Sequence, residues 1–127
     1  MDRIDLQVAV NRLKPEEITR QPTGEPSVLV RERVQSARDR ACQRFKAEPS
    51  VRCNAVMQSC HLRQWCQLDD ASRNLLEVAI RKLGLSARAS DRILKVARTI
   101  ADLAGDEDLK TLHVAEAIQY RTIDRMQ

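Results

Sequence analysis

The sequence predicts a mainly α-helical fold, a four-helix bundle preceded by a strand or extended segment. Four stretches repeat apolar residues at spacings of three and four, which is the period of a helix with one buried face. Glycine or proline follows three of these stretches, as expected at helix ends. At 127 residues, the chain is long enough for one modest domain with a core of its own.

The first ten residues alternate apolar and polar side chains from Ile4 to Val10. This period of two predicts a half-buried strand. Because one strand is not stable alone, we expect its sheet partners to lie outside this chain. Residues 11–26 contain three prolines and no periodic face, which predicts a linker with one short helical turn after Lys14. We therefore expect two parts, the strand with its linker over residues 1–26 and a helical domain over residues 27–127.

A long helix is predicted over about residues 28–47, with Ser27 as its N-cap and Pro49 after its end. Its apolar stripe contains Val30, Val34, Ala37, Ala41 and Phe45. The opposite face carries five arginines, Arg31, Arg33, Arg38, Arg40 and Arg44. Such a face is usually solvated, but it also suits a neighbouring subunit, nucleic acid or nucleotide phosphates.

A shorter helical segment is expected over about residues 56–67, in a region that holds Cys53, Cys60, His61 and Cys66. Structural zinc sites usually draw ligands from close pairs of cysteines, whereas these cysteines are separated by six and five residues. Adjacent helical residues also point about 100° apart. We therefore expect no metal site and no Cys–His nucleophile pair, and we expect Cys60 and Cys66 to fill small apolar spaces.

Three further helices complete the predicted bundle. Asp69 or Asp70 caps the first, over about residues 71–83, and Gly84 ends it. Ser86 caps the second, over about 87–104, and Gly105 supplies its left-handed C-cap. Thr111 caps the third, over about 112–123. The inward-facing residues are Leu75, Leu76, Ala79, Ile80 and Leu83, then Ala89, Ile93, Val96, Ala97, Ile100 and Ala104, then Leu112, Ala115, Ile118 and Ile123.

The net charge of +4 lies in the first half of the chain, where residues 1–68 hold 12 basic and 8 acidic side chains. This mild excess suits a polyanion or an acidic partner but does not identify DNA binding. No apolar run approaches the roughly 18 residues of a membrane span, and the polar start does not resemble a signal peptide. We expect a cytoplasmic protein with reduced cysteines and no membrane partner.

Arg88 stands out because it falls in the first turn of the helix that Ser86 caps. A cation there opposes the helix dipole by roughly 0.3–1 kcal/mol. An anion that completes the site would offset this cost, since helix N-termini bind phosphates. In the alternative, Arg88 only pairs with Asp91, which is worth about 0.2–0.5 kcal/mol.

Residues 85–89 (LSARA) and 92–103 (RILKVARTIADL) closely resemble the C-terminal lid domain of magnesium-chelatase-like AAA+ ATPases of the competence-associated ComM type. Residues 2–6 are similar to the last core strand of that ATPase module, and 115–121 to the end of the lid. The resemblance implies that Arg88 is the sensor-2 residue, which reaches the terminal phosphates of ATP. It also implies that Arg3 is the arginine finger, which acts on the ATP of a neighbouring subunit.

The resemblance further implies a longer parent protein, with ATP and Mg²⁺ bound by its AAA+ core, neighbouring subunits in a hexamer, and DNA as the substrate. The sequence has no G-x-x-x-x-G-K-[ST] motif, so this chain alone is not expected to hold a nucleotide or to hydrolyse it. The alternatives are a magnesium chelatase subunit that acts on porphyrin, a stand-alone helical module that binds nucleic acid through the five arginines, and a zinc-stabilised module.

Substitution Arg88→Ala is expected to change the free energy of unfolding by no more than about 0.5 kcal/mol, because an exposed residue without a structural role contributes little. Thermal and urea unfolding of the 127-residue chain measure this. A large loss of stability would instead indicate that Arg88 is a structural residue.

Overall fold

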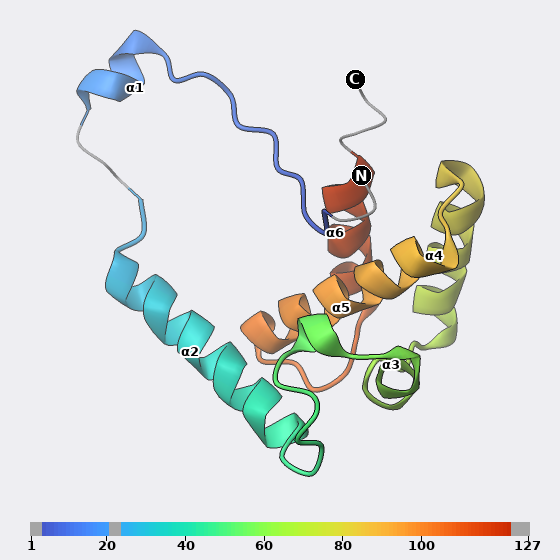
Figure 1. Cartoon of the computed structure of the whole chain (residues 1–127). Helices are drawn as coiled ribbons and strands as arrows, with labels where there is room; N and C mark the ends of the chain where they lie inside the picture. The colour runs from blue at the N-terminus through green and yellow to red at the C-terminus, as the bar shows by residue number, and fades with distance from the viewer. Residues whose placement is uncertain (1–3, 21–23, 123–127) are drawn as a thin grey trace.

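The computed structural model describes residues 4–20 and 24–122, which contain six α-helices, one 3-10 helix and no strand (Figure 1). The predicted mainly α fold with four principal helices is confirmed. Within the described residues, no helix is both long and apolar enough to cross a membrane. The elements in order are α1 (Pro15–Thr19), α2 (Ser27–Arg44), η1 (Asn54–Val56), α3 (Ser59–Trp65), α4 (Asp70–Leu83), α5 (Ala87–Ala104) and α6 (Thr111–Thr122).

Helix α5 is the central packing element of the bundle. It contacts α2, η1, α3 and α6, while α4 packs against α6. Four residues at intervals of four, Ala89, Ile93, Ala97 and Ala101, are at most 5% exposed. Because three of them are alanines, the neighbouring helices can approach α5 closely. Of the expected inward residues of α5, Ala104 at its C-terminal end is exposed.

The predicted caps of α4 and α5 are present. The carboxylate of Asp69, not that of Asp70, accepts a hydrogen bond from the Ser72 N–H at 2.7 Å. The hydroxyl of Ser86 accepts one from the Ala89 N–H at 3.1 Å. Gly84 and Gly105 end the two helices with φ values of 61° and 79°, which are left-handed angles that residues with a Cβ rarely adopt.

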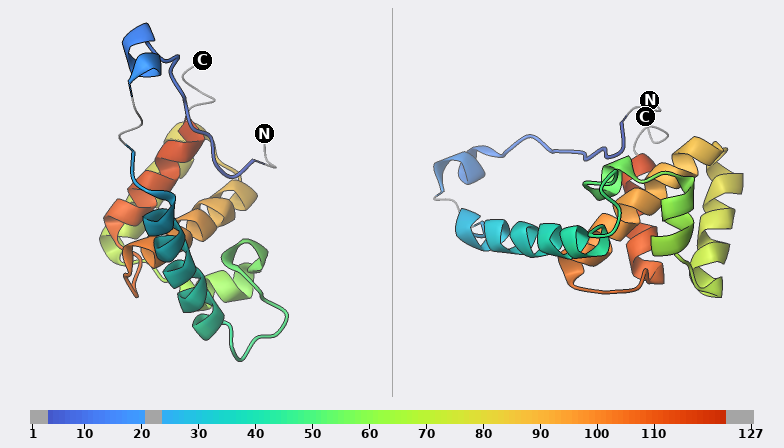
Figure 2. Two further views of the ribbon diagram at one scale, coloured as in Figure 1. Left: turned by 90° about the vertical axis from the view of Figure 1, so that its left-hand side faces the viewer. Right: turned by 60° about the horizontal axis from the view of Figure 1, so that its bottom comes forward.

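Helix α2 differs from its prediction at both ends. Ser27 is its first residue and the N-cap Pro26 makes no side-chain bond, while the helix ends at Arg44, earlier than expected. Ala37 and Ala41 are buried, but Val30 and Val34 are 38% and 41% exposed. The N-terminal half of α2 extends past the rest of the bundle (Figures 1 and 2), so no described helix covers that part of its apolar stripe.

Residues 4–14 are extended, but the predicted strand is not formed in this part of the chain. Its apolar side chains, expected to be half-buried, are exposed, from 44% at Ile4 to 87% at Val10. The segment arches away from the bundle to α1 and returns at the start of α2 (Figure 1). A strand needs a backbone partner, and no other described segment is extended alongside this one.

The segment expected as one helix over 56–67 is divided into η1 and α3. Trp65 at the end of α3 packs edge-on against Phe45 after α2, with ring centroids 5.1 Å apart. Cys66 is buried as predicted, whereas Cys60 is exposed, so the prediction for Cys60 was wrong. Leu112, expected to face inward, is also exposed, at 62%. Ile123 lies outside the described residues.

Candidate functional site

The first turn of α5 presents Arg88 to solvent. Gly84 ends α4, Ser86 caps α5, and Arg88 follows as the second helical residue. Among the described residues, Arg88 has no ion pair or hydrogen bond from its side chain, so the alternative pairing with Asp91 is not formed. An unpaired guanidinium at the positive end of an 18-residue helix is suited to an anionic ligand.

Arg3, the other predicted site residue, lies outside the described residues. The described chain resumes at Ile4, and Asp5 contacts α5 through Arg92, with Asp5 Oδ1 and Arg92 Nη1 2.7 Å apart. The structure therefore fixes the position of the backbone just after Arg3 relative to α5.

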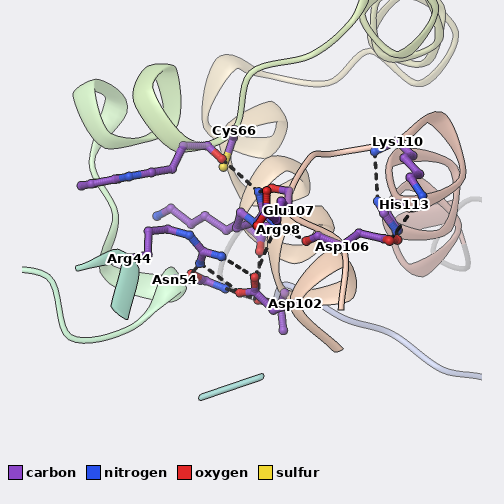
Figure 3. Close-up of polar contacts among 12 residues, drawn as sticks. Arg44, Asn54, Cys66, Arg98, Asp102, Asp106, Glu107, Lys110 and His113 are labelled. Atoms are coloured by element: carbon purple, nitrogen blue, oxygen red, sulfur yellow. Dashed lines mark hydrogen bonds and ion pairs between the residues drawn. The ribbon is translucent and has the colours of Figure 1, made fainter. Parts of the chain in front are cut away.

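A buried polar network at the other end of α5 was not predicted. The Asp102 carboxylate, 2% exposed, accepts hydrogen bonds from both terminal nitrogens of Arg44 on α2 (Figure 3). Asn54 of η1 donates to the same carboxylate at 3.0 Å and accepts from Arg44 at 3.1 Å. Helices α2, η1 and α5 are thus joined at one carboxylate.

Arg98 is the second cation of this network and is 3% exposed. Its Nη2 lies 3.4 Å from Asp102, and its guanidinium donates to the carbonyl oxygens of Trp65, Asp106 and Glu107 (Figure 3). Burial lowers the pKa of Arg98, and the nearby Arg44 lowers it further. The carbonyl contacts hold the loop between α5 and α6 against α5.

The network corrects the prediction for the basic face of α2 at one arginine, Arg44, because Arg31, Arg33, Arg38 and Arg40 are exposed as expected. Arg44 points into the interior, and Arg33 pairs with Glu25 at 2.8 Å. Arg44 follows Ala37 and Ala41 by seven and three residues, so it continues their buried face. Likewise, Arg98 and Asp102 are spaced i and i+4 beside the apolar stripe of α5. These spacings are the sequence signals that could have identified the network.

Both histidines cap helices. His61 and His113 each occupy the third helical position, and each Nδ1 accepts the backbone N–H of the N-cap residue, at 2.9 Å and 3.0 Å. Nδ1 therefore carries no proton, and Nε2 is the donor nitrogen. Nε2 of the fully buried His113 lies 3.0 Å from Asp106. A hydrogen bond from Lys110 keeps the pKa of Asp106 below its usual value.

The four cysteines are free thiols. Within residues 4–20 and 24–122, no group of three or more histidine, cysteine or acidic side chains is arranged to hold a metal ion. Burial raises the pKa of the Cys66 thiol to about 11, an effect that the nearby Arg98 partly opposes. Such a thiol is protonated and unreactive at neutral pH.

The fold and this arrangement define a class of small helical domain in which an exposed arginine begins the central helix and a buried ion-pair network fixes its far end. The chain belongs to the family described as magnesium chelatase, subunit ChlI C-terminal, whose model matches residues 24–121.

Similar proteins extend beyond this domain. The competence protein ComM of Haemophilus influenzae is 39% identical over 127 residues, which cover 99% of this chain and 24% of that protein. The protein YifB of Escherichia coli shows the same identity and coverage. An uncharacterized protein of Mycobacterium tuberculosis is 36% identical over 121 residues. The chain thus spans about a quarter of the length of these relatives.

Substitution Asp102→Asn is expected to lower the free energy of unfolding by about 3–5 kcal/mol, because it leaves two buried guanidinium groups without their counter-charge. Urea denaturation measures this loss. Asp70→Asn is the matched control, since Asp70 and Arg73 are exposed and 4.0 Å apart, and it should cost no more than about 0.5 kcal/mol. Equal losses for the two variants would contradict the assigned role of Asp102.

The raised pKa of Cys66 predicts a loss of stability in alkaline solution. Below pH 9.0, its ordinary pKa, the thiol is protonated in both the folded and the unfolded chain. As the pH rises from 9 to about 11, only the unfolded chain releases the proton, so the stability falls by up to about 2–3 kcal/mol. The stability difference between the wild type and Cys66→Ala should therefore change over this range. A constant difference would contradict the prediction.

Proposed function

We propose that this chain is the C-terminal lid domain of a magnesium-chelatase-like AAA+ ATPase, and that it couples ATP binding and hydrolysis to movement of the domain in a ring. In this proposal residues 27–127 are the lid, and residues 1–26 are the end of the ATPase core and the linker. The parent belongs to the competence-associated branch, is a hexamer and acts on DNA.

The observation that carries the proposal is the unpaired Arg88 in the first turn of α5. In a chain of this family, an exposed cation at a helix N-terminus suits the terminal phosphates of ATP, which carry the charge that the helix end favours. ATP and Mg²⁺ would be held by the core, because this sequence has no phosphate-binding loop. Arg88 would then respond to the γ-phosphate of its own subunit.

Exposed apolar surface supports the presence of further polypeptide around this domain. Four apolar residues of the projecting half of α2 are 38–61% exposed. The extended segment adds Leu6, Val8 and Val10, at 52–87%. Soluble domains seldom leave such neighbouring apolar side chains uncovered. We assign them to contacts with the AAA+ core of the same chain and with neighbouring subunits.

Arg3 completes the proposal as the finger that acts in trans on the ATP of the next subunit. The competence-associated branch, and with it the action on DNA, is supported by the resemblance of residues 85–89 and 97–103 and by the similarity to a competence protein. The porphyrin-metallating alternative lacks this support. The stand-alone nucleic-acid module loses Arg44, one of its five arginines, to the interior.

A chimera tests the proposal, with this chain in place of the matching C-terminal quarter of the H. influenzae ComM protein. Its ATP hydrolysis is expected to fall about 10³–10⁵-fold with Arg3→Ala, the loss typical of an arginine finger. With Arg88→Ala it should fall at least about tenfold, because a contact to the reacting phosphate is removed. Arg81→Ala is the control, since Arg81 is exposed in the last turn of α4.

Turnover in the Arg81→Ala chimera should match that of the unsubstituted chimera. The proposal would be wrong if the unsubstituted chimera assembled but hydrolysed no ATP. It would also be wrong if both Arg3→Ala and Arg88→Ala left hydrolysis unchanged.

A further inference from the structure

Polar contacts attach the extended N-terminal segment to the bundle, beside an apolar groove that Leu6 and Val8 line together with residues of α5. Asp5 pairs with Arg92 of α5 at 2.7 Å, the Gln7 N–H donates to the Tyr120 carbonyl at 3.0 Å, and Arg121 donates to the Ile4 carbonyl at 3.1 Å. These contacts span most of the chain, since Asp5 and Arg92 are 87 residues apart. They fix the segment against both α5 and α6.

The alternation of the segment determines which side faces the bundle. Asp5 and Gln7 are partly buried against it, whereas Ile4, Leu6 and Val8 are 44%, 52% and 66% exposed. Leu6 and Val8 line an apolar groove on α5 but stay more than half exposed, so the hydrophobic effect alone does not account for the position of the segment. The ion pair with Arg92 therefore contributes directly to the position of this segment.

Arg92 itself is well placed to control that position. Its side chain is 17% exposed and that of Asp5 is 44% exposed, so solvent screens the pair in part. Arg92 lies four residues after Arg88, on the same face of α5 and one turn further along. Asp5 lies two residues after Arg3. The ion pair thus connects the backbone that follows Arg3 to the turn of α5 that follows Arg88.

We propose that Arg92 is a positioning residue, whose ion pair with Asp5 holds the backbone that follows Arg3 at a fixed place on the helix that presents Arg88. The inference rests on the proposed function of Arg3 and Arg88. Its consequence is that a movement of α5, when Arg88 binds or releases a phosphate, is passed through Arg92 to the residue that acts on the neighbouring subunit.

The first experiment uses the 127-residue chain and needs no nucleotide. Amide hydrogen exchange of Gln7 measures how often the segment detaches from α6, because this N–H donates a hydrogen bond to the Tyr120 carbonyl. Arg92→Gln and Asp5→Asn should each speed its exchange about two- to five-fold, and the double variant should do no more than either one. Arg88→Gln, on the same face of α5, is the control and should leave the exchange unchanged.

Additive effects of the two substitutions would overturn the proposal, because they would show that Asp5 and Arg92 act independently. Unchanged exchange in both single variants would overturn it as well. High salt should reduce the difference between Arg92→Gln and the wild type, since a partly exposed ion pair is screened.

The second experiment uses the chimera with the H. influenzae ComM protein. Arg92→Gln should lower the maximal rate of ATP hydrolysis about tenfold or more with little change in the apparent KM for ATP, because the displaced group acts after ATP is bound. Arg92→Lys, which keeps the charge, and the exchanged pair Asp5→Arg with Arg92→Asp should each recover part of the rate. A contact that only stabilised the fold would not lower the maximal rate while leaving KM unchanged, and the exchanged pair would not restore that rate.

The outcomes separate the two proposals. If Arg3→Ala and Arg88→Ala reduce hydrolysis but Arg92→Gln does not, the positioning role is wrong and the proposed function stands. If neither Arg3→Ala nor Arg88→Ala reduces hydrolysis, the proposed function is wrong, and with it the role of Arg92 in coupling, while the exchange experiment still decides whether the ion pair holds the segment.

Discussion

Two guanidinium groups share one buried carboxylate in this domain, and the relative placement of its helices depends on that contact. Asp102 is enclosed by Arg44 from α2, Arg98 from its own helix and Asn54 from η1. The dipoles of three carbonyl oxygens, which accept hydrogen bonds from Arg98, take the place of water around the second cation. Taking three charges out of water is costly, so the groups are stable inside only when every partner is in place. The network therefore favours one arrangement of α2, η1 and the loop after α5.

This constraint gives the two halves of α2 different properties. Its C-terminal half is fixed by Arg44, Ala37 and Ala41, whereas its N-terminal half extends past the bundle with apolar residues exposed. Helix α5 shows a similar division, since its far end is held by the network and its first turn is open to solvent at Arg88. The surfaces left open are those that the proposed ATPase core and neighbouring subunits would cover.

Much of the fold could be predicted because its signals are local. The period of the apolar residues located the principal helices, and Asp69, Ser86, Gly84 and Gly105 marked where two of them begin or end. Helix boundaries were less certain where no side-chain cap exists, as at the start of α2. Arg88 was identified from its position in the first turn, and the structure leaves it exposed there. Its role in binding a phosphate stays a prediction.

Local sequence signals specify the helical class of this protein, the order of its principal helices and the arginine in the first turn of α5. These features follow from the helical period of the apolar residues and from N-cap side chains that bond a backbone N–H three residues later. They also follow from two glycines, which adopt left-handed φ values without strain. The burial of Arg44 in an ion pair and the extended, unpaired backbone of residues 4–14 depend on long-range contacts. Arg44 and Asp102 are 58 residues apart, and a strand requires a backbone partner that no local pattern supplies. Such contacts exist only once the helices have been brought together.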